Sequence, residues 1–213
     1  CGNNEKIKNN TTPKEQSVSL AAVGATFPLP FYNSAIKTYS KKEGTHITYG
    51  GIGSGGGIRA LKDRVVDFGA TDAFLNDKEE YEMPAPIIHI PTCIGAVVLA
   101  YNLPHIGELK LTNENISDLF MGKITKWNDK RLKASNPNVK LPNLNVSVIH
   151  RSDGSGTTYI FSDYMSIISH SWETQVGRGK ALKWPVGMGA KGNPGVAGQV
   201  QQVKGALGYI GSE

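Results

Sequence analysis

The sequence has few of the features that mark metalloproteins, membrane-spanning proteins or nucleic-acid-binding proteins. It contains two cysteines, and its five histidines lie far apart without metal-ligand spacing. No apolar run approaches the roughly 18 residues that cross a bilayer. The 23 lysines and arginines are scattered and do not form a stripe with aromatics between them. We therefore expect no metal, cofactor or nucleic acid, and a chain of 213 residues that folds as one large domain or two modest lobes.

Cys1 is the first residue of the chain and precedes a polar segment rich in Asn, Lys and Thr. Because residues 1–16 cannot bury enough apolar surface to fold, they are expected to be a flexible tether. A leading cysteine before such a tail resembles a mature bacterial lipoprotein, which makes Cys1 a candidate lipidation site outside the cytoplasm; the alternative is a chain that simply begins here. Cys93 lies in an apolar run and is expected to be a buried, inert thiol.

The first part of the chain alternates strand-like and helix-like segments, which is typical of a largely parallel sheet. A helix opening at Pro28 and Pro30 is expected to end at Gly44. The expected elements are a strand over 17–23, that helix, a strand over 46–49, a short helix over 58–65 and a strand over 65–68.

Beyond Pro86 an extended apolar segment follows, and it is suited to pass from one lobe to another. A second unit then contains a helix over 113–121, a strand over 146–150 and a helix over 160–168. The resulting division is a first lobe over 17–90, a second lobe over 91–204, and residues 205–213 as the start of a crossing back to the first lobe.

Four short runs of Gly, Ser and Thr each lie between a strand-like and a helix-like segment. Small residues let backbone N–H groups approach a guest, and a helix N-terminus offers unpaired N–H donors with a partial positive charge. Four such loops in one chain predict one oxyanion held from several sides, in a cleft between two lobes. The runs cover residues 24–27, 50–57, 69–72 and 151–157.

The run that begins at Arg151 gives the strongest signal. Arg151 can offer a charged, bidentate fork to an oxyanion, and Asp153 could pair with it and hold it in place. Ser155 and Thr157 add hydroxyls, and Gly156 adds an unobstructed N–H. The alternative is an ordinary Asp-Gly turn followed by a capping serine.

The glycine-rich run at 50–57 lacks the Gly-Lys-Ser/Thr ending of a nucleotide-binding loop. Ser54 is therefore a candidate anion donor, and the alternative is a plain flexible loop. Neither Ser54 nor Ser155 fits the G-x-S-x-G pattern of a nucleophilic serine.

Asp72 is unusual among these donors, because a carboxylate repels an anion unless the anion brings a proton to share. Phosphate carries such a proton at neutral pH and sulfate does not, so Asp72 could select phosphate. From the residues alone, an Asp that caps the next helix explains the pattern equally well.

These segments together resemble the phosphate-binding proteins of bacterial high-affinity phosphate ABC transporters, the PstS family. The matching segments run in the family's order from about Ser17 to the end of the chain: residues 24–28, 49–57, 66–72, 122–129, 151–157 and 205–210. Family members usually continue well beyond this length, so the first lobe is expected to be incomplete, or the chain to be a fragment or a trimmed variant.

The resemblance implies a two-lobe, type II periplasmic-binding-protein fold of α/β class, with mixed sheets and phosphate bound non-covalently in the cleft. It also implies a monomer that delivers phosphate to a membrane permease and is not an enzyme. Asp153 matches the residue that orients the arginine, and Asp72 the proton acceptor. The implied phosphate ligands are Thr26, Phe27, Ser54, Asp72, Arg151, Ser155, Gly156 and Thr157. The alternatives are the same fold with another tetrahedral oxyanion, such as sulfate or molybdate, a phosphatase-like enzyme that uses Ser54 or Ser155, and a surface adhesin that merely retains the anion site.

Overall fold

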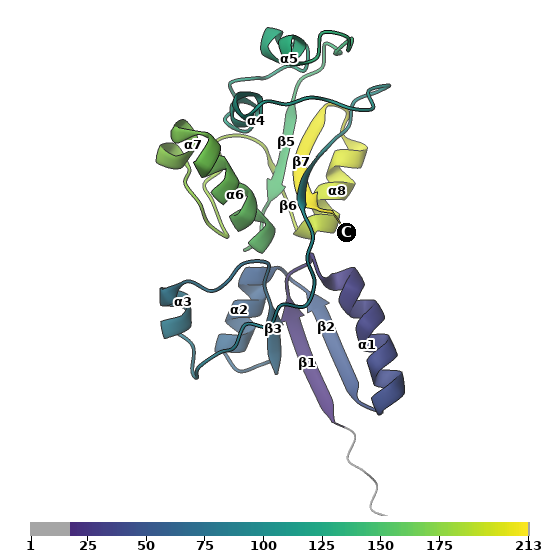
Figure 1. Ribbon diagram of the computed structural model, residues 1–213, viewed down its shortest axis with the longest axis vertical. Helices are drawn as coiled ribbons and strands as arrows, with labels where there is room; N and C mark the ends of the chain where they lie inside the picture. The colour runs from purple at the N-terminus through teal and green to yellow at the C-terminus, as the bar shows by residue number, and fades with distance from the viewer. Residues whose placement is uncertain (1–17, 213) are drawn as a thin grey trace, which may run out of the picture.

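The protein forms two α/β lobes stacked along its long axis, each with its own sheet (Figure 1). This computed structural model describes residues 18–212. Cys1 and the expected tether over 1–16 lie outside the described residues. The two-lobed arrangement with two α/β sheets agrees with the predicted fold class.

The first lobe contains a three-stranded parallel sheet in the order β2-β1-β3. Parallel neighbours need a connection that crosses back over the sheet, and helices supply it here. All three strands run toward the waist between the lobes, so their carboxyl ends meet there (Figure 1). The elements are β1 (Ser19–Gly24), α1 (Leu29–Glu43), β2 (His46–Gly51), α2 (Ser54–Lys62), β3 (Phe68–Ala70) and α3 (Asp77–Tyr81).

Local chemistry explains the ends of α1. Pro28 occupies the N-cap and Pro30 the first turn, where a missing N–H costs nothing. Gly44 ends the helix with a left-handed φ of 68°, and its N–H donates to the carbonyl of Ser40. The helix that the prolines and Gly44 predict is therefore confirmed. The third strand lies at 68–70, later than the predicted 65–68. Just before it, the side-chain carboxylate of Asp67 accepts the Ala21 N–H at 2.7 Å.

The second lobe contains a mixed four-stranded sheet in the order β4-β7-β5-β6. β4 (Val97–Tyr101) runs antiparallel to β7 (Ala206–Gly211), whereas β5 (Ser147–Arg151) is parallel to β7 and to β6 (Met188–Ala190). Residues 206–211, within the segment that we expect to start a crossing back to the first lobe, form an interior strand of this sheet. Their nearly continuous burial is typical of a strand covered on both faces.

Helices cover both faces of the second sheet (Figure 1). The larger core cluster joins α4 and α6 to the sheet around Phe120, Phe161 and Tyr209, and Phe161 stacks on Tyr209 with ring centroids 4.3 Å apart. A smaller cluster packs α8 on the opposite face. The helices are α4 (Asn113–Phe120), α5 (Lys130–Ser135), α6 (Gly156–Ile168), α7 (His170–Gln175) and α8 (Gly192–Gln202).

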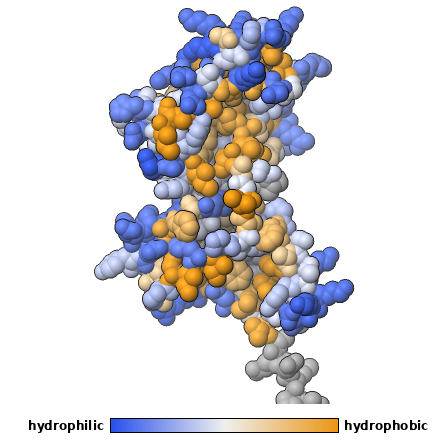
Figure 2. All heavy atoms as spheres, viewed as in Figure 1, coloured by the Kyte–Doolittle hydropathy of each residue, from blue (hydrophilic) through white to orange (hydrophobic). Residues whose placement is uncertain are grey.

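Residues 84–96, before β4, link the two lobes as an extended and largely exposed segment, which we call the strap (Figure 1). It carries apolar side chains at the surface, with Ile94 99% and Ile88 87% exposed. Figure 2 shows apolar side chains gathered near the waist on this face. The prediction of a buried Cys93 was wrong, since the thiol is exposed on this strap. No helix among residues 18–212 is long and apolar enough to span a membrane.

Candidate functional site

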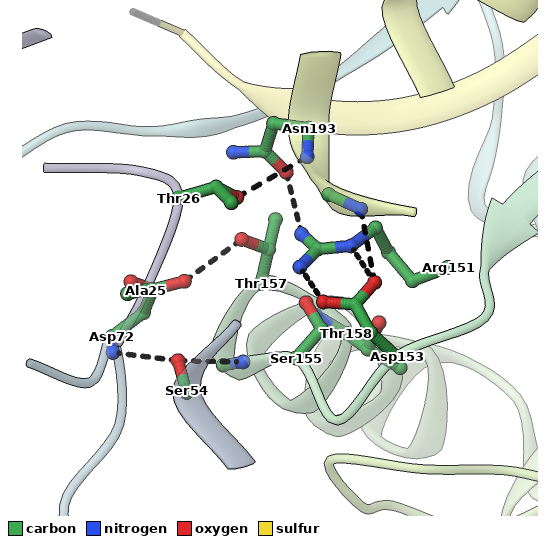
Figure 3. A network of polar contacts seen from close by, with 12 residues as sticks. Ala25, Thr26, Ser54, Asp72, Arg151, Asp153, Ser155, Thr157, Thr158 and Asn193 are labelled. Atoms are coloured by element: carbon green, nitrogen blue, oxygen red, sulfur yellow. Dashed lines mark hydrogen bonds and ion pairs between the residues drawn. The ribbon is translucent and has the colours of Figure 1, made fainter. Parts of the chain in front are cut away.

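Two helix N-termini face one another across the waist. α2 begins at Ser54, after β2 of the first lobe, and α6 begins at Gly156, after β5 of the second. The Gly55 N–H donates to the carbonyl of Gly154 at 2.8 Å, so the two loops touch backbone to backbone. Figure 3 shows the polar side chains that gather between them. A guest at this place would meet the positive ends of both helix dipoles.

Arg151 is the cation of the site and is almost completely buried, with a side chain 1% exposed. Its Nε and Nη2 donate to the two carboxylate oxygens of Asp153 at 2.8 and 2.6 Å, and its Nη1 donates to Asn193 Oδ1 at 2.8 Å (Figure 3). These bonds use three of the five guanidinium donors. Two donors remain to be directed at a guest.

Asp153 is held as the partner that the sequence indicated. Burial alone would raise its pKa, but hydrogen bonds from Arg151 and from the Gly192 N–H hold the pKa below its ordinary value. The carboxylate is therefore charged at neutral pH and balances the guanidinium. Gly53 makes room for it: its φ is +89°, and a Cβ there would lie 2.3 Å from Asp153 Oδ2.

Ser54 is buried at the start of α2, with 1% of its surface exposed. Its Oγ accepts the Gly156 N–H of the other lobe at 3.0 Å and the Asp72 N–H at 3.4 Å. Because Oγ is occupied as an acceptor, its single proton is available for donation. A Cβ on Gly156 would lie 2.6 Å from this oxygen, so the close approach requires glycine.

Asp72 follows β3 and points across the waist. Its Oδ2 accepts the hydroxyl of Thr157 at 2.8 Å, which joins the lobes directly (Figure 3). The alternative role as a helix cap is not what the structure shows, because Asn76 is the N-cap of α3 and accepts the Glu79 N–H. Asp72 therefore belongs to the polar cluster at the waist.

Thr26 and Phe27 approach the cluster from the end of β1. Thr26 is 6% exposed, and its hydroxyl oxygen accepts the Asn193 N–H at 3.2 Å. Phe27 instead turns toward the strap, against Gly95. It also lines a cavity of about 350 Å³ beside the cluster, which shares Asp72 but is walled mainly by strap residues such as Ile90 and Ile94.

Ser155 has a structural task in addition to its predicted one. It is the N-cap of α6, and its Oγ accepts the Thr158 N–H at 3.0 Å. Its own N–H donates to the carbonyl of Lys180 at 2.8 Å. The alternative of a turn with a capping serine is therefore what these hydrogen bonds show, and the role of the loop in binding an anion stays a prediction.

Asn193, which the sequence pattern did not single out, contacts both Arg151 and Thr26. Its signal was present but weak, since Gly192-Asn193-Pro194 has the proline expected at a helix start. Tyr209 was not singled out either: its hydroxyl accepts the Arg151 N–H at 3.2 Å and bonds Thr158 Oγ1 at 2.6 Å. Neither residue lies in one of the four loops that the composition marks.

The arrangement suits a small oxyanion. Hydroxyls and N–H groups from both lobes lie near a guanidinium whose charge Asp153 already balances, so neutral donors would carry much of the interaction with such a guest. No group of three or more His, Cys, Asp or Glu side chains within residues 18–212 has the placement of a metal site.

The two α/β lobes with a polar cluster between them agree with a periplasmic-binding-protein-like fold. The sequence matches the family described as the PBP superfamily domain over residues 10–213, and the chain belongs to that family.

The chain is also similar over most of its own length to proteins that are named PstS. The chain is 46% identical over 202 residues to the phosphate-binding protein PstS of Haemophilus influenzae, a match that covers 94% of this chain and 60% of that protein. It is 43% identical over 208 residues to PstS of Xylella fastidiosa strain 9a5c, covering 95% of this chain and 57% of that protein. The chain thus spans about three fifths of the length of these relatives.

The fold is also found in solved structures. A phosphate-binding protein from Stenotrophomonas maltophilia superposes with a TM-score of 0.67 at 16% identity, over 92% of this chain and 60% of that one. At this level of identity the likeness concerns the fold.

Proposed function

We propose that the protein is a solute-binding protein that captures inorganic phosphate by hydrogen bonds at the waist and delivers it to the membrane permease of an ABC transporter. It acts as a receptor and not as an enzyme. The proposed ligands are Thr26, Phe27, Ser54, Asp72, Arg151, Ser155, Gly156 and Thr157, with Asp153 orienting the arginine. Phe27 contributes its backbone N–H, since its ring turns toward Gly95.

The observation that carries this proposal is the meeting of donors from both lobes. Ser54 of the first lobe lies 3.0 Å from the Gly156 nitrogen of the second, and Asp72 lies 2.8 Å from the Thr157 hydroxyl. An ion beside these direct contacts would be held by groups of both lobes, and closure would exclude water and strengthen each contact. Charge-assisted hydrogen bonds contribute about 1.5–3 kcal/mol each. Several of them suffice for micromolar affinity, about −8 kcal/mol, after association costs.

Asp72 favours phosphate over the other tetrahedral oxyanions. Its carboxylate can accept the proton of hydrogen phosphate, but it would face an unprotonated oxygen of sulfate or molybdate. A site built for one such hydrogen bond can reject the analogue that lacks it by about 10⁴-fold. The names of the relatives point to the same ion.

Isothermal titration calorimetry at neutral pH tests the proposal. We expect one phosphate site of micromolar or tighter affinity, with sulfate not competing at equal concentration. Competition by sulfate would overturn the role of Asp72, and absence of phosphate binding would overturn the function and favour the adhesin alternative. Turnover of a chromogenic phosphate ester, abolished by Ser54→Ala or Ser155→Ala, would instead favour the enzymatic alternative.

The cellular setting forms part of the same proposal. A receptor that supplies a permease works outside the cytoplasm, and lipidation of Cys1 would anchor it to the bacterial membrane, with at least two acyl chains needed for stable attachment. Mass spectrometry of the native protein tests this directly, since an acylated Cys1 carries the added mass and an unmodified one does not.

A further inference from the structure

An ion pair joins the lobes at a distance along the waist from the proposed ligands. Lys180 lies in the loop between α7 and β6, and Glu79 lies in α3 of the first lobe. Lys180 Nζ and Glu79 Oε2 are 2.6 Å apart, and the two side chains are only 12% and 26% exposed. Figure 1 shows this loop of the second lobe extending down toward α3.

Each partner also has a second contact beside the ion pair. Glu79 Oε2 also accepts the Asn76 N–H at 3.0 Å in the capping box that starts α3, so its carboxylate is already oriented. The Lys180 ammonium lies 5.8 Å from the ring centroid of Tyr159 on α6. An ion pair between two oriented, partly buried groups loses less to side-chain entropy and screening than an ordinary surface pair.

Lys180 is also tied to the proposed phosphate loop. Its carbonyl accepts the N–H of Ser155, the N-cap of α6, at 2.8 Å. The same residue therefore holds the anion loop of one lobe through its backbone and reaches the other lobe through its side chain. This connection couples the position of the loop to the closure of the lobes.

We propose that the Lys180–Glu79 pair is a latch that stabilises the closed arrangement of the lobes and slows the release of bound phosphate. The pair spans two lobes, so it must break when they separate. An interaction present only in the closed state shifts the equilibrium toward that state by its own free energy. The inference rests on the proposed phosphate-binding function and assigns a positioning role to two residues that do not contact the ion.

The decisive variants remove the charge and leave the local structure. Glu79→Gln keeps an acceptor for the Asn76 N–H, and Lys180→Met keeps the aliphatic stem and the backbone carbonyl that Ser155 contacts. Asp163→Asn is the matched control, because it breaks the 2.7 Å Arg178–Asp163 pair, which lies wholly within the second lobe. Thermal unfolding of each variant verifies that it folds.

The measurement is the dissociation rate of radiolabelled inorganic phosphate during a chase with unlabelled phosphate. We expect each latch variant to release phosphate about fivefold faster than the wild type, which corresponds to about 1 kcal/mol. The double variant should be no faster than either single variant, and the exchanged pair Lys180→Glu with Glu79→Lys should recover most of the slow release. The control should release at the wild-type rate.

The latch fails if the single variants release phosphate at the wild-type rate, or if the control accelerates release equally. A second measurement separates this failure from failure of the proposed function. Without phosphate, small-angle scattering should give a larger radius of gyration for the double latch variant than for the wild type. If the wild type binds no phosphate, the proposed function is wrong, but the scattering comparison still tests the latch. Equal radii of gyration for the wild type and the double variant would overturn the latch.

Discussion

The amide oxygen of Asn193 accepts a hydrogen bond from Arg151 Nη1 at 2.8 Å, while the N–H of the same residue donates to Thr26 Oγ1 at 3.2 Å. Asn193, which is 4% exposed, thus joins the buried cation of the second lobe to a hydroxyl of the first. Because the Thr26 oxygen accepts this N–H, its own proton is available for a guest.

Asn193→Ala is expected to weaken phosphate binding about tenfold, since the buried guanidinium loses the acceptor that orients it. Titration calorimetry measures this change. Asn136→Ala is the matched control: Asn136 is equally buried, and its amide donates to the carbonyls of Lys110 and Leu132 away from the site. The control should lose stability and keep its affinity, and equal affinities for both variants would contradict the role of Asn193.

Asp72→Asn is expected to reduce the preference of the site for phosphate over sulfate. The amide can donate to an unprotonated oxygen, so sulfate should bind more tightly than to the wild type, while phosphate loses the acceptor for its proton and binds at least tenfold more weakly. Competition calorimetry with both anions at neutral pH measures the two changes. Unchanged discrimination against sulfate would show that Asp72 does not select the ion.

Asp153 should make stability depend on pH in acid. Its pKa in the folded protein lies below the ordinary value of 3.8, so its charge stabilises the fold above that value, and the contribution is lost as the pH falls through the lowered pKa. Asp153→Asn leaves Arg151 buried without its counterion and should cost about 3 kcal/mol of unfolding free energy at neutral pH. Urea denaturation across a series from about pH 6 to pH 2 should show a shallower loss for the variant. Parallel curves would contradict the linkage.

Tyr209→Phe should destabilise the protein by about 1–3 kcal/mol, because it leaves the Arg151 N–H and the Thr158 hydroxyl without their buried partner. Tyr164→Phe removes a hydroxyl that also bonds a side chain, Asn113 at 3.0 Å, but from a residue that is 44% exposed. That control should change the unfolding free energy by less than about 0.5 kcal/mol. If urea denaturation gave the same loss of unfolding free energy for both variants, burial of the Tyr209 hydroxyl would not explain the loss.

Gly57→Ala should destabilise the first lobe by about 1–3 kcal/mol, since the new Cβ would lie 2.6 Å from the Gly24 Cα, where α2 packs on β1. Gly198→Ala in α8 meets nothing within 4 Å and should instead stabilise its helix by up to about 1 kcal/mol. Thermal unfolding of the two variants should therefore move in opposite directions. If Gly57→Ala were as stable as the wild type, α2 would have to lie farther from β1 than it does in this structure.

Much of the fold could be read from the sequence because local chemistry decides it. Pro28 and Gly44 fix the two ends of α1, and the apolar spacing of residues 160–168 predicts the helix that the structure places at Gly156–Ile168. The loops were recognisable because only small residues allow the approach of Gly156 to Ser54. These features depend on neighbours in sequence or on backbone geometry.

The rest depends on contacts between distant segments. The strand at residues 206–211 pairs with β4 and β5, which are distant from it in the sequence. Cys93 looked buried from its apolar neighbours, yet the strap that carries it is exposed. Asn193 contacts Thr26 across 167 positions, a separation at which composition gives no signal.

A crystal structure of the protein with inorganic phosphate tests the central claim most directly. The account predicts one tetrahedral ion at the waist, within hydrogen-bonding distance of Ser54, Arg151 and the Gly156 N–H, with one of its oxygens against the Asp72 carboxylate. An ion bound elsewhere, or lobes whose donors stay on separate surfaces around it, would contradict the account.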